Sequence, residues 1–414
     1  MGHPTPLLID ATGRDIQGEA ARIRARGPLT RVELPGEVEA WSVSSPELLK
    51  RLLTDPRVSK DARQHWPRFI DGLITPEWPL FTWVAVHNMF TAYGGDHKRL
   101  RTLVSKAFTA RRTAALKPRI EQITKELLDG IAEAGRGAER VDLREALCYP
   151  LPIRVISELF GLREENSAEL RKLVDRIFDT SAEPGEMTAA YERLYAVLGE
   201  LVASKRQSPG DDLTTGLITA RDEEGDTRLS EQELLDTLVL MISAGHETTV
   251  NLLDNAIHAL LTHPEQLAHV RSGRASWDDV VEETLRRDAP VASLPLRYAV
   301  EDIDLGELGG PEGTVISKGE PIVAAYAAAG RHPELHGADA DVFDVTRADK
   351  EHLAFGYGVH HCLGAPLGRM EARVALPALF ERFPDLELAA DEAELGHVES
   401  FISNGHRRLP VRLG

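Results

Sequence analysis

The sequence predicts a mainly helical fold with small β-sheets, and three observations support this prediction. Apolar residues recur at three- and four-residue steps through most of residues 97–285, the spacing of helices with one buried face. Short strand-like runs lie before and after that region, at 29–34, 39–43, 314–316 and 321–323. The Gly- and Pro-containing stretches are short and resemble loops rather than linkers, so residues 1–414 are expected to form a single domain.

The first elements are expected to be small. Between about Gly18 and Arg57, a short helix is mixed with the first two strand-like segments. Residues 66–93 then form a loop-rich segment with many aromatic side chains. The helical region follows and includes regularly spaced apolar residues over 120–131, and the last short strands are expected after Pro290.

The longest predicted helix covers residues 230–263. Ser230 and Glu233 have the spacing of a capping box at its start. Pro264 ends the helix, because the residue before a proline disfavours helical geometry. Residues 234–242 are apolar nearly all round, which indicates a buried helix.

Two residues in the middle of this helix are unfavourable for folding. Gly245 costs about 1 kcal/mol relative to alanine at such a position. The carboxylate of Glu247 is costly to bury unless it is paired. Two such residues within one apolar helix, in the segment Ala244–Thr249, indicate a function rather than packing.

A glycine-rich segment near the C-terminus contains one of the two cysteines, Cys362. Glycines on both sides of it suit a tightly bent backbone. A helix-like stretch follows at 367–373, and the unpaired N–H groups of a helix start stabilise a thiolate. Cys362 is therefore a candidate metal ligand, and a buried structural cysteine on a glycine-rich turn is the alternative.

This segment resembles the haem-binding loop of the cytochromes P450, Phe-x-x-Gly-x-x-x-Cys-x-Gly. The matching residues are Phe355, Gly358, Cys362 and Gly364, and His360 stands where bacterial members usually have histidine. The resemblance extends over essentially the whole chain. It implies the cytochrome P450 fold, haem b (iron protoporphyrin IX) as cofactor, and Cys362 as the thiolate ligand of its iron.

The polar segment of the long helix is similar to the family's Ala/Gly-Gly-x-Asp/Glu-Thr. On that resemblance, Ala244 and Gly245 leave room for dioxygen above the iron, and Glu247 and Thr248 form an acid–alcohol pair that relays protons. The residues themselves allow other roles. Glu247 could be satisfied by a nearby Arg or Lys, and Thr248 could bond to a carbonyl one turn earlier.

Haem carries two propionates, which need cationic or N–H partners. His97 and Arg101 are similar to the family's His-x-x-x-Arg and share one helix face. Arg297 and His360 match two further propionate-binding positions of the family. Any one of these four could also be an ordinary solvated side chain.

Glu283 and Arg286 match the family's Glu-x-x-Arg, a buried pair that supports the fold around the haem. Many members place an arginine just before the position of Phe343, where this chain has Val342. Arg331 and Arg347 are therefore both candidates to complete the ion network.

The net charge of −18 argues against nucleic-acid binding. No apolar stretch approaches the length of a membrane span, and the N-terminus lacks the basic and apolar regions of a signal peptide. Two cysteines make no disulfide framework, as in reducing compartments. A cytoplasmic protein without nucleic-acid or membrane partners is expected.

Electrons are expected from separate proteins, a ferredoxin and a ferredoxin reductase, because the chain contains no cysteine cluster and no additional flavin domain. A basic stretch suits the docking of an acidic ferredoxin. It contains Lys98, Arg99, Arg101, Lys106, Arg111 and Arg112. A solvated helix face with propionate contacts is an equally good interpretation.

The expected reaction is the insertion of one oxygen atom from O2 into a C–H bond of a bulky apolar molecule, steroid-like or macrolide/polyketide-like. By resemblance, 66–93 covers the pocket, 178–195 forms a lid, and 291–296 and 401–403 line its walls. The aromatic and apolar residues of the cover suggest the class of ligand. They are Phe81, Trp83, Met89 and Phe90.

Other chemistries fit the sequence less well. His360, His361 and Cys362 are adjacent, so their side chains diverge and do not match zinc spacing. A cysteine hydrolase has no support beyond composition, and no phosphate-binding glycine motif is complete. Two alternatives stay open: a peroxide-driven haem-thiolate peroxygenase, and a haem protein that binds a ligand without turnover.

Overall fold

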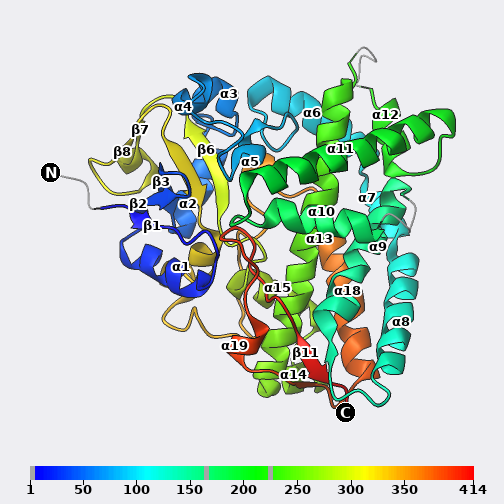
Figure 1. The fold of residues 1–414 in the computed structure, drawn as a ribbon. Helices are drawn as coiled ribbons and strands as arrows, with labels where there is room; N and C mark the ends of the chain where they lie inside the picture. The colour runs from blue at the N-terminus through cyan, green and yellow to red at the C-terminus, as the bar shows by residue number, and fades with distance from the viewer. Residues whose placement is uncertain (1–4, 163–166, 222–226) are drawn as a thin grey trace.

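The computed structural model describes residues 5–162, 167–221 and 227–414. Helices make up most of the fold, and the largest sheet lies at one side of them (Figure 1). The longer helices are α6 (Gly94–Ala107), α8 (Lys117–Ala134), α9 (Pro150–Phe160), α10 (Ser167–Phe178), α11 (Pro184–Gln207), α13 (Glu231–Thr262), α15 (Trp277–Arg287) and α18 (Ala365–Arg382). The prediction of a mainly helical fold with small sheets is confirmed.

Shorter helices connect these elements. They are α1 (Ile16–Ala25), α2 (Pro46–Thr54), α3 (Ala62–His65), α4 (Pro67–Ile70), α5 (Phe81–Ala85), α7 (Ala110–Ala115), α12 (Leu213–Thr219), α14 (Pro264–Arg271), α16 (Tyr326–Gly330), α17 (Pro333–His336) and α19 (Glu392–Leu395). A π-helical turn, Arg144–Cys148, precedes α9, and 3₁₀ turns occupy Leu305–Leu308 and Gly358–His360.

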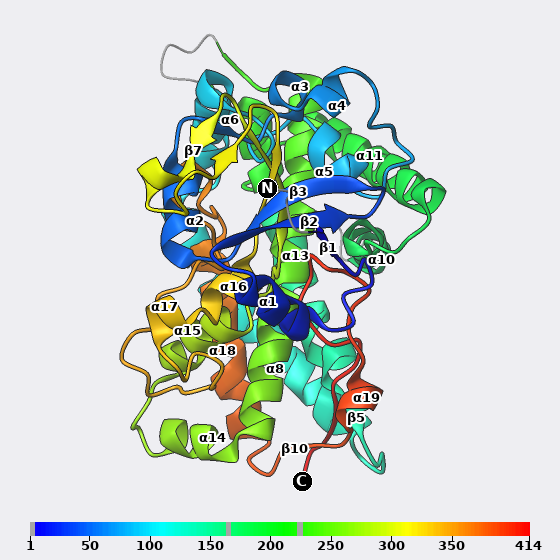
Figure 2. The ribbon, with the colours of Figure 1, turned by 90° about the vertical axis from the view of Figure 1, so that its left-hand side faces the viewer.

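The largest sheet has six strands in the order β1-β2-β3-β9-β6-β4 and lies in front of α13 in Figure 2. Their bounds are β1 (Leu7–Leu8), β2 (Leu29–Leu34), β3 (Val38–Val43), β9 (Pro321–Ala324), β6 (Leu294–Ala299) and β4 (Val58–Ser59). β2 and β3 form an antiparallel hairpin with Leu29 opposite Val43. Gly36 lies in its turn at φ 77°, a left-handed value that favours glycine.

Two smaller sheets complete the fold. One has the order β10-β11-β5, and the other pairs β7 with β8. These strands are β5 (Val141–Asp142), β7 (Ile303–Asp304), β8 (Val315–Ile316), β10 (Glu387–Leu388) and β11 (Pro410–Arg412). The four named strand runs correspond to β2, β3, β8 and β9, and β6 lies in the region after Pro290 where further short strands were expected.

Helix α13 begins as the sequence predicts. The Ser230 hydroxyl accepts from the Glu233 N–H, and the Glu233 carboxylate accepts from the Ser230 N–H, so the capping box is complete. The helix packs against α9, α10, α11, α15 and α18. It is therefore the central helix, and its middle is positioned from several sides.

Apolar side chains form one large cluster among the helices and two smaller clusters around the six-stranded sheet. In the described part of the chain, no helix is long and apolar enough to span a membrane. The organisation of residues 1–414 as a single domain stays a prediction.

Candidate active site

A cavity lies between the middle of α13 and the glycine-rich segment that contains Cys362. Ser243, Ala244, Gly245, Thr248 and Thr249 face it from α13. Phe355, Gly356, His360, Cys362 and Gly364 line it from the glycine-rich segment. The structure therefore brings together the two motifs that the sequence analysis identified, although more than a hundred residues separate them in the chain.

The backbone around Cys362 is sharply folded. The Cys362 N–H donates to the Phe355 carbonyl at 2.9 Å, which closes the loop. Gly358 has φ 71°, and a Cβ there would lie 2.8 Å from the carbonyl oxygen of Leu53. Glycine is required at this position for both reasons. The loop ends where α18 begins at Ala365, and the Cys362 side chain is exposed to the cavity.

Two opposing effects act on the Cys362 thiol. Burial raises its pKa, whereas the N–H groups of Gly364 and Ala365 and the charges of Arg101 and Arg369 lower it. The sequence expectation that the helix start favours the thiolate is correct in direction, but burial is the larger effect. A bound cation would reverse the balance, because a thiol that coordinates a metal is deprotonated.

Basic side chains gather around His360 at the edge of the cavity. The rings of His97 and His360 lie 4.2 Å apart between centroids. Arg101 donates to the His361 carbonyl at 2.7 Å, and Arg297 projects from β6. Burial lowers the pKa of His360, and the nearby charge of Arg297 lowers it further.

These basic side chains suit an anionic partner. His97 and Arg297 are buried, and His97 Nε2 and Arg297 Nη1 have no hydrogen-bond partner among the described residues. Buried polar atoms normally have partners, so an anionic group is expected here. The two propionates of haem fit this requirement, with the Cys362 sulfur facing the same cavity.

Lys60 belongs to the same group of basic side chains, although the sequence analysis did not identify it. It follows β4, is only 3% exposed, and lines the cavity. Its Nζ lies 3.4 Å from the Leu296 carbonyl and 3.9 Å from the centre of the Phe90 ring. Burial lowers its pKa well below the usual value, and Arg297 adds to this effect. No motif marks Lys60 in the sequence, because its neighbours are distant in the chain.

We predict that Lys60→Met weakens haem binding, because it removes a buried basic group that would pair with a propionate. A charge-assisted hydrogen bond contributes about 1.5–3 kcal/mol, so haem transfer to apomyoglobin should accelerate roughly tenfold or more. Lys98→Met, which alters an exposed lysine on α6, is the matched control. Equal transfer rates for Lys60→Met and the control would contradict this placement of Lys60.

On α13, Thr248 lines the cavity and donates to the Ala244 carbonyl at 2.6 Å. Its hydroxyl oxygen can still accept a hydrogen bond from the cavity side. Ala244 is exposed to the cavity. A Cβ on Gly245 would meet the side chain of Ile156 on α9 at 2.6 Å, so close helix packing also requires this glycine.

Glu247 does not line the cavity. It is 2% exposed, and its Oε1 accepts from the Asn251 amide at 3.1 Å and from the Ser403 hydroxyl at 3.0 Å. Arg144 lies 3.5 Å from the same oxygen. Burial raises the pKa of Glu247, and Arg144 is the largest opposing influence. One oxygen of Glu247 is thus held by these three residues, and the side chain must turn toward Thr248 to act as the acid of the pair.

A second buried carboxyl group, Glu371 on α18, faces the cavity and was missed from the sequence. It is fully buried, and neither carboxyl oxygen has a partner among the described residues. Burial raises its pKa well above the usual value. Its spacing of four from Leu367 places it on the buried face of the helix, which is the signal that could have identified it.

The Glu283–Arg286 pair is buried on α15, as the resemblance implies. Arg286 donates to both oxygens of Glu283, at 2.7 and 2.8 Å, and also to the Val342 carbonyl at 3.0 Å. Arg347 Nε lies 3.6 Å from the same carboxylate. Arg331 instead pairs with Asp288, so Arg347 is the arginine that completes the network.

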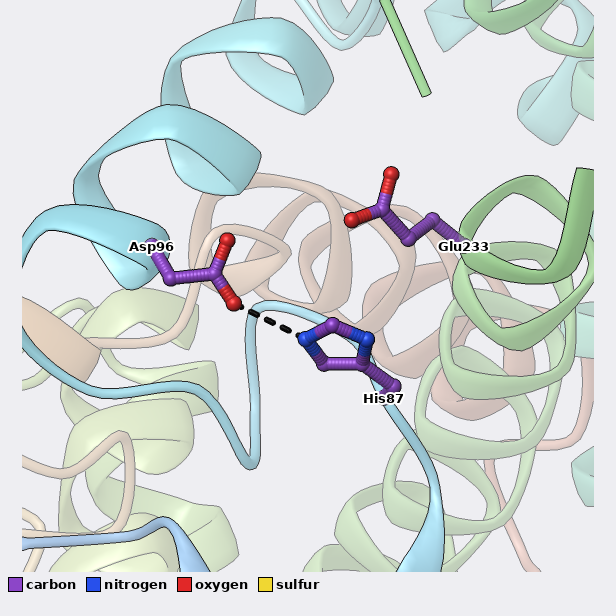
Figure 3. Close-up of side chains that lie close together, drawn as sticks. All are labelled: His87, Asp96 and Glu233. Carbon is purple, nitrogen blue, oxygen red and sulfur yellow. Dashed lines mark hydrogen bonds and ion pairs between the residues drawn. The ribbon is translucent and has the colours of Figure 1, made fainter. Parts of the chain in front are cut away.

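The segment 66–93, which covers the cavity, is hydrogen-bonded to the first turns of α13. The His87 N–H donates to Asp236 at 2.7 Å, and the Tyr195 hydroxyl from α11 also donates to Asp236. His87 Nε2 lies 2.8 Å from Asp96 Oδ2, and the Glu233 side chain lies close to both residues (Figure 3). These three side chains resemble a metal site in their spacing, but Arg99 bonds to both carboxylates and makes the group an ion-pair network.

The structure corrects part of the expected pocket wall. Trp83, Met89, Phe90, Val291 and Leu294 line the cavity, as expected. Phe81 and 401–403 are absent from its lining. Phe401 and Ile402 pack into the apolar cluster beside the sheet, and Ser403 bonds to Glu247 instead.

The basic stretch is only partly available to a partner. Lys98, Lys106 and Arg111 are exposed. Arg99 and Arg112 are engaged in ion pairs, and Arg101 reaches the cavity. The expected patch is thus reduced to three exposed cations.

Comparisons with known proteins agree with this geometry. The family model described as "Cytochrome P450" matches residues 199–273 and 277–395. The chain is 46% identical to the 2-hydroxy-5-methyl-1-naphthoate 7-hydroxylase of Streptomyces carzinostaticus, over 99% of this chain and 97% of that protein. It is 40% identical to cytochrome P450 monooxygenase PikC of Streptomyces venezuelae, over 99% and 94% respectively.

Solved structures are similar along the whole chain. CYP154A1 from Streptomyces coelicolor A3(2) aligns with a TM-score of 0.91 at 55% identity, covering 99% of this chain and 100% of that one. A testosterone-bound CYP154C4 from Streptomyces sp. ATCC 11861 aligns with a TM-score of 0.92 at 42% identity, covering 99% of each chain.

Proposed function

Because this chain belongs to the cytochrome P450 family and is a haem-thiolate monooxygenase, we propose that it hydroxylates a bulky apolar ring system of the polyketide, macrolide or steroid type. The observation that carries the proposal is the cavity in which the Cys362 sulfur and the Thr248 hydroxyl both lie. Its remaining lining is largely apolar and includes Trp83, Met89 and Phe178. Such a lining favours a large hydrophobic ligand.

Each site residue has a role in this proposal. Cys362 would ligate the iron, and His97, Arg101, Arg297, His360 and Lys60 would hold the propionates. When bound, the haem supplies the activation of dioxygen and the insertion of one oxygen atom into a C–H bond, while the protein orients the substrate. Thr248 would hold a proton at its hydroxyl on the cavity side, and Glu247 would resupply it.

Electrons would come from a ferredoxin and its reductase. The exposed cations Lys98, Lys106 and Arg111 support docking of an acidic partner. Docking of this kind is weakened by salt, because surface charges are screened over about 8–10 Å at physiological ionic strength. A reduction rate that does not fall as salt rises would count against these cations. Cytoplasmic localisation stays a prediction.

The test of function compares oxidants in the purified holoenzyme. Macrolide lactones, hydroxynaphthoates and testosterone are first titrated for the change that each causes in the haem absorption spectrum. Ligands that bind are then incubated with dioxygen, NADPH and a surrogate ferredoxin system, or with hydrogen peroxide alone. Hydroxylated product from dioxygen supports the proposal. Product with peroxide but none with dioxygen would indicate a peroxygenase, and binding without product under either condition would indicate a haem protein without turnover.

The ligand assignment is tested separately, with the carbon monoxide difference spectrum of the reduced protein. A Soret band at the thiolate position is expected, and Cys362→Ala should lose it. Cys148→Ala is the matched control, because Cys148 is fully buried away from the cavity. Retention of the thiolate band in Cys362→Ala would overturn the assignment.

A further inference from the structure

Helix α10 packs against α13 (Figure 1). Its Asp175 places a partly exposed carboxyl group beside Glu247 of α13. One ligand atom each of Asp175, His246 and Glu247 lies within 4.8 Å of the others. The side chain of Asp175 is 35% exposed, whereas His246 and Glu247 are buried. Asp175 therefore stands at the boundary between solvent and the buried acid.

The polar atoms of this group lack partners. Asp175 Oδ1, Glu247 Oε2 and both ring nitrogens of His246 have no hydrogen-bond partner among the described residues. A fully buried imidazole without a partner is rare, because the desolvation of an unpaired polar group is costly. A water molecule or a small side-chain rotation would connect the three groups.

The surrounding charges disfavour a metal ion in this group. Arg144 approaches Glu247, and Arg171 Nε lies 3.6 Å from Asp175 Oδ2. Arg171 also bonds to Glu145 at the surface and stacks on the Tyr149 ring, 3.8 Å from its centre. Two arginines beside the ligand atoms repel a cation, whereas exchange of protons leaves the total charge of the group unchanged.

We propose that Asp175 is the entry point at which protons from solvent pass through His246 to Glu247, the buried acid of the proposed function. Protonated Asp175 donates its proton to the nitrogen of neutral His246 that lies near both carboxyl groups, and the same nitrogen passes the proton on to Glu247 Oε2. Asp175 becomes ionised, Glu247 becomes neutral, and His246 ends in its starting form. Asp175 then takes a new proton from water.

The pKa values of Asp175 and His246 agree with proton transfer from Asp175 toward Glu247. Burial raises the pKa of Asp175 to about 7, and the Glu247 charge raises it further, against Arg171 and Arg144. Burial lowers the pKa of His246 to about 3, so its imidazole is neutral and can both accept and donate. The charged and titratable groups that face Asp175 are Glu247, His246, Arg171, Arg144, Glu145 and Tyr149.

The inference rests on the role proposed for Glu247, and the test separates the two. Asp175→Asn, His246→Gln and Glu247→Gln are compared in the holoenzyme, with testosterone as the probe or, if it fails to bind, the tightest ligand from the titrations above. Glu169→Gln on α10 is the matched control, because Glu169 is a surface carboxylate paired with Arg193. Asp175→Glu serves as the conservative rescue.

Turnover with dioxygen and NADPH requires proton uptake, whereas hydrogen peroxide already carries its protons. We expect Asp175→Asn and His246→Gln to lower dioxygen-driven product formation about tenfold or more and to leave peroxide-driven formation unchanged. The wild-type rate should fall as pH rises through about 7, because Asp175 must be protonated to donate. This fall should disappear in Asp175→Asn and return in Asp175→Glu.

The outcomes are distinct. If Glu247→Gln lowers the dioxygen-driven rate and Asp175→Asn does not, the entry point is wrong and the role of Glu247 stands. If neither variant lowers the dioxygen-driven rate, both the entry point at Asp175 and the role of Glu247 are wrong. Equal losses with dioxygen and peroxide indicate structural damage and count against the entry point. Independently, carbon-13 NMR of labelled aspartate in the reduced, carbon monoxide-bound wild type should show an Asp175 titration that Glu247→Gln displaces.

Discussion

Thr248→Ala is expected to bind haem and substrate normally but to release hydrogen peroxide in place of most of the product. The Thr248 hydroxyl lines the cavity, and its loss removes the group to which the proposed function assigns the holding of a proton. General acid catalysis by a positioned side chain contributes typically about 10²–10⁴-fold, so product formed per NADPH should fall at least about tenfold. NADPH consumption, peroxide and product are measured together.

The neighbouring threonine provides the control for this experiment. Thr249 also lines the cavity, and its hydroxyl donates to the Gly245 carbonyl at 3.2 Å. Thr249→Ala removes a similar volume and hydroxyl one position along the helix. The role of Thr248 is refuted if coupling of NADPH use to product is unchanged in Thr248→Ala, or if both variants lose coupling equally.

Arg286→Met is expected to give the largest loss of stability. The substitution leaves the fully buried carboxylate of Glu283 with Arg347 as its remaining arginine neighbour. It also removes the donors to the Ala340 and Val342 carbonyls. Breaking one partner of a buried ion pair costs about 3–5 kcal/mol. Chemical unfolding followed by circular dichroism should show this loss, and little haem should remain bound.

A surface pair on the neighbouring helices is the reference for this measurement. Arg373 on α18 pairs with Asp278 on α15, and both side chains are well exposed. Arg373→Met should cost no more than about 1 kcal/mol, because exposed pairs are screened by solvent. If Arg286→Met lowered the free energy of unfolding by no more than Arg373→Met does, the buried pair would not be needed for folding.

Much of this fold could be predicted because the signals are local. The capping box of α13 needs only Ser230 and Glu233, three residues apart, and the structure contains it. The spacing of apolar residues likewise indicated the helices between 97 and 285. By contrast, the bounds of β6 were not predicted within the region after Pro290, because its pairing with β9 depends on residues more than twenty positions away.

The site residues also divide into those that a short motif predicts and those whose position depends on distant parts of the chain. Cys362, Thr248, Ala244 and Arg297 lie at the cavity as expected, since each belongs to a short motif. Glu247 turned away toward Arg144, a residue with no motif. Phe401 and Ile402 packed into the core instead of lining the pocket, because apolar side chains of this size suit either environment.

The sequence by itself determined the class of fold, the thiol that faces the cavity and the polar segment of the central helix, because these depend on spacings of a few residues. Only the tertiary structure decided which charged side chains lie close to one another. Lys60 approaches Arg297, Arg347 rather than Arg331 approaches Glu283, and Asp175 approaches Glu247. The energy of a buried charge depends on distances between elements far apart in the chain, and folding alone sets those distances.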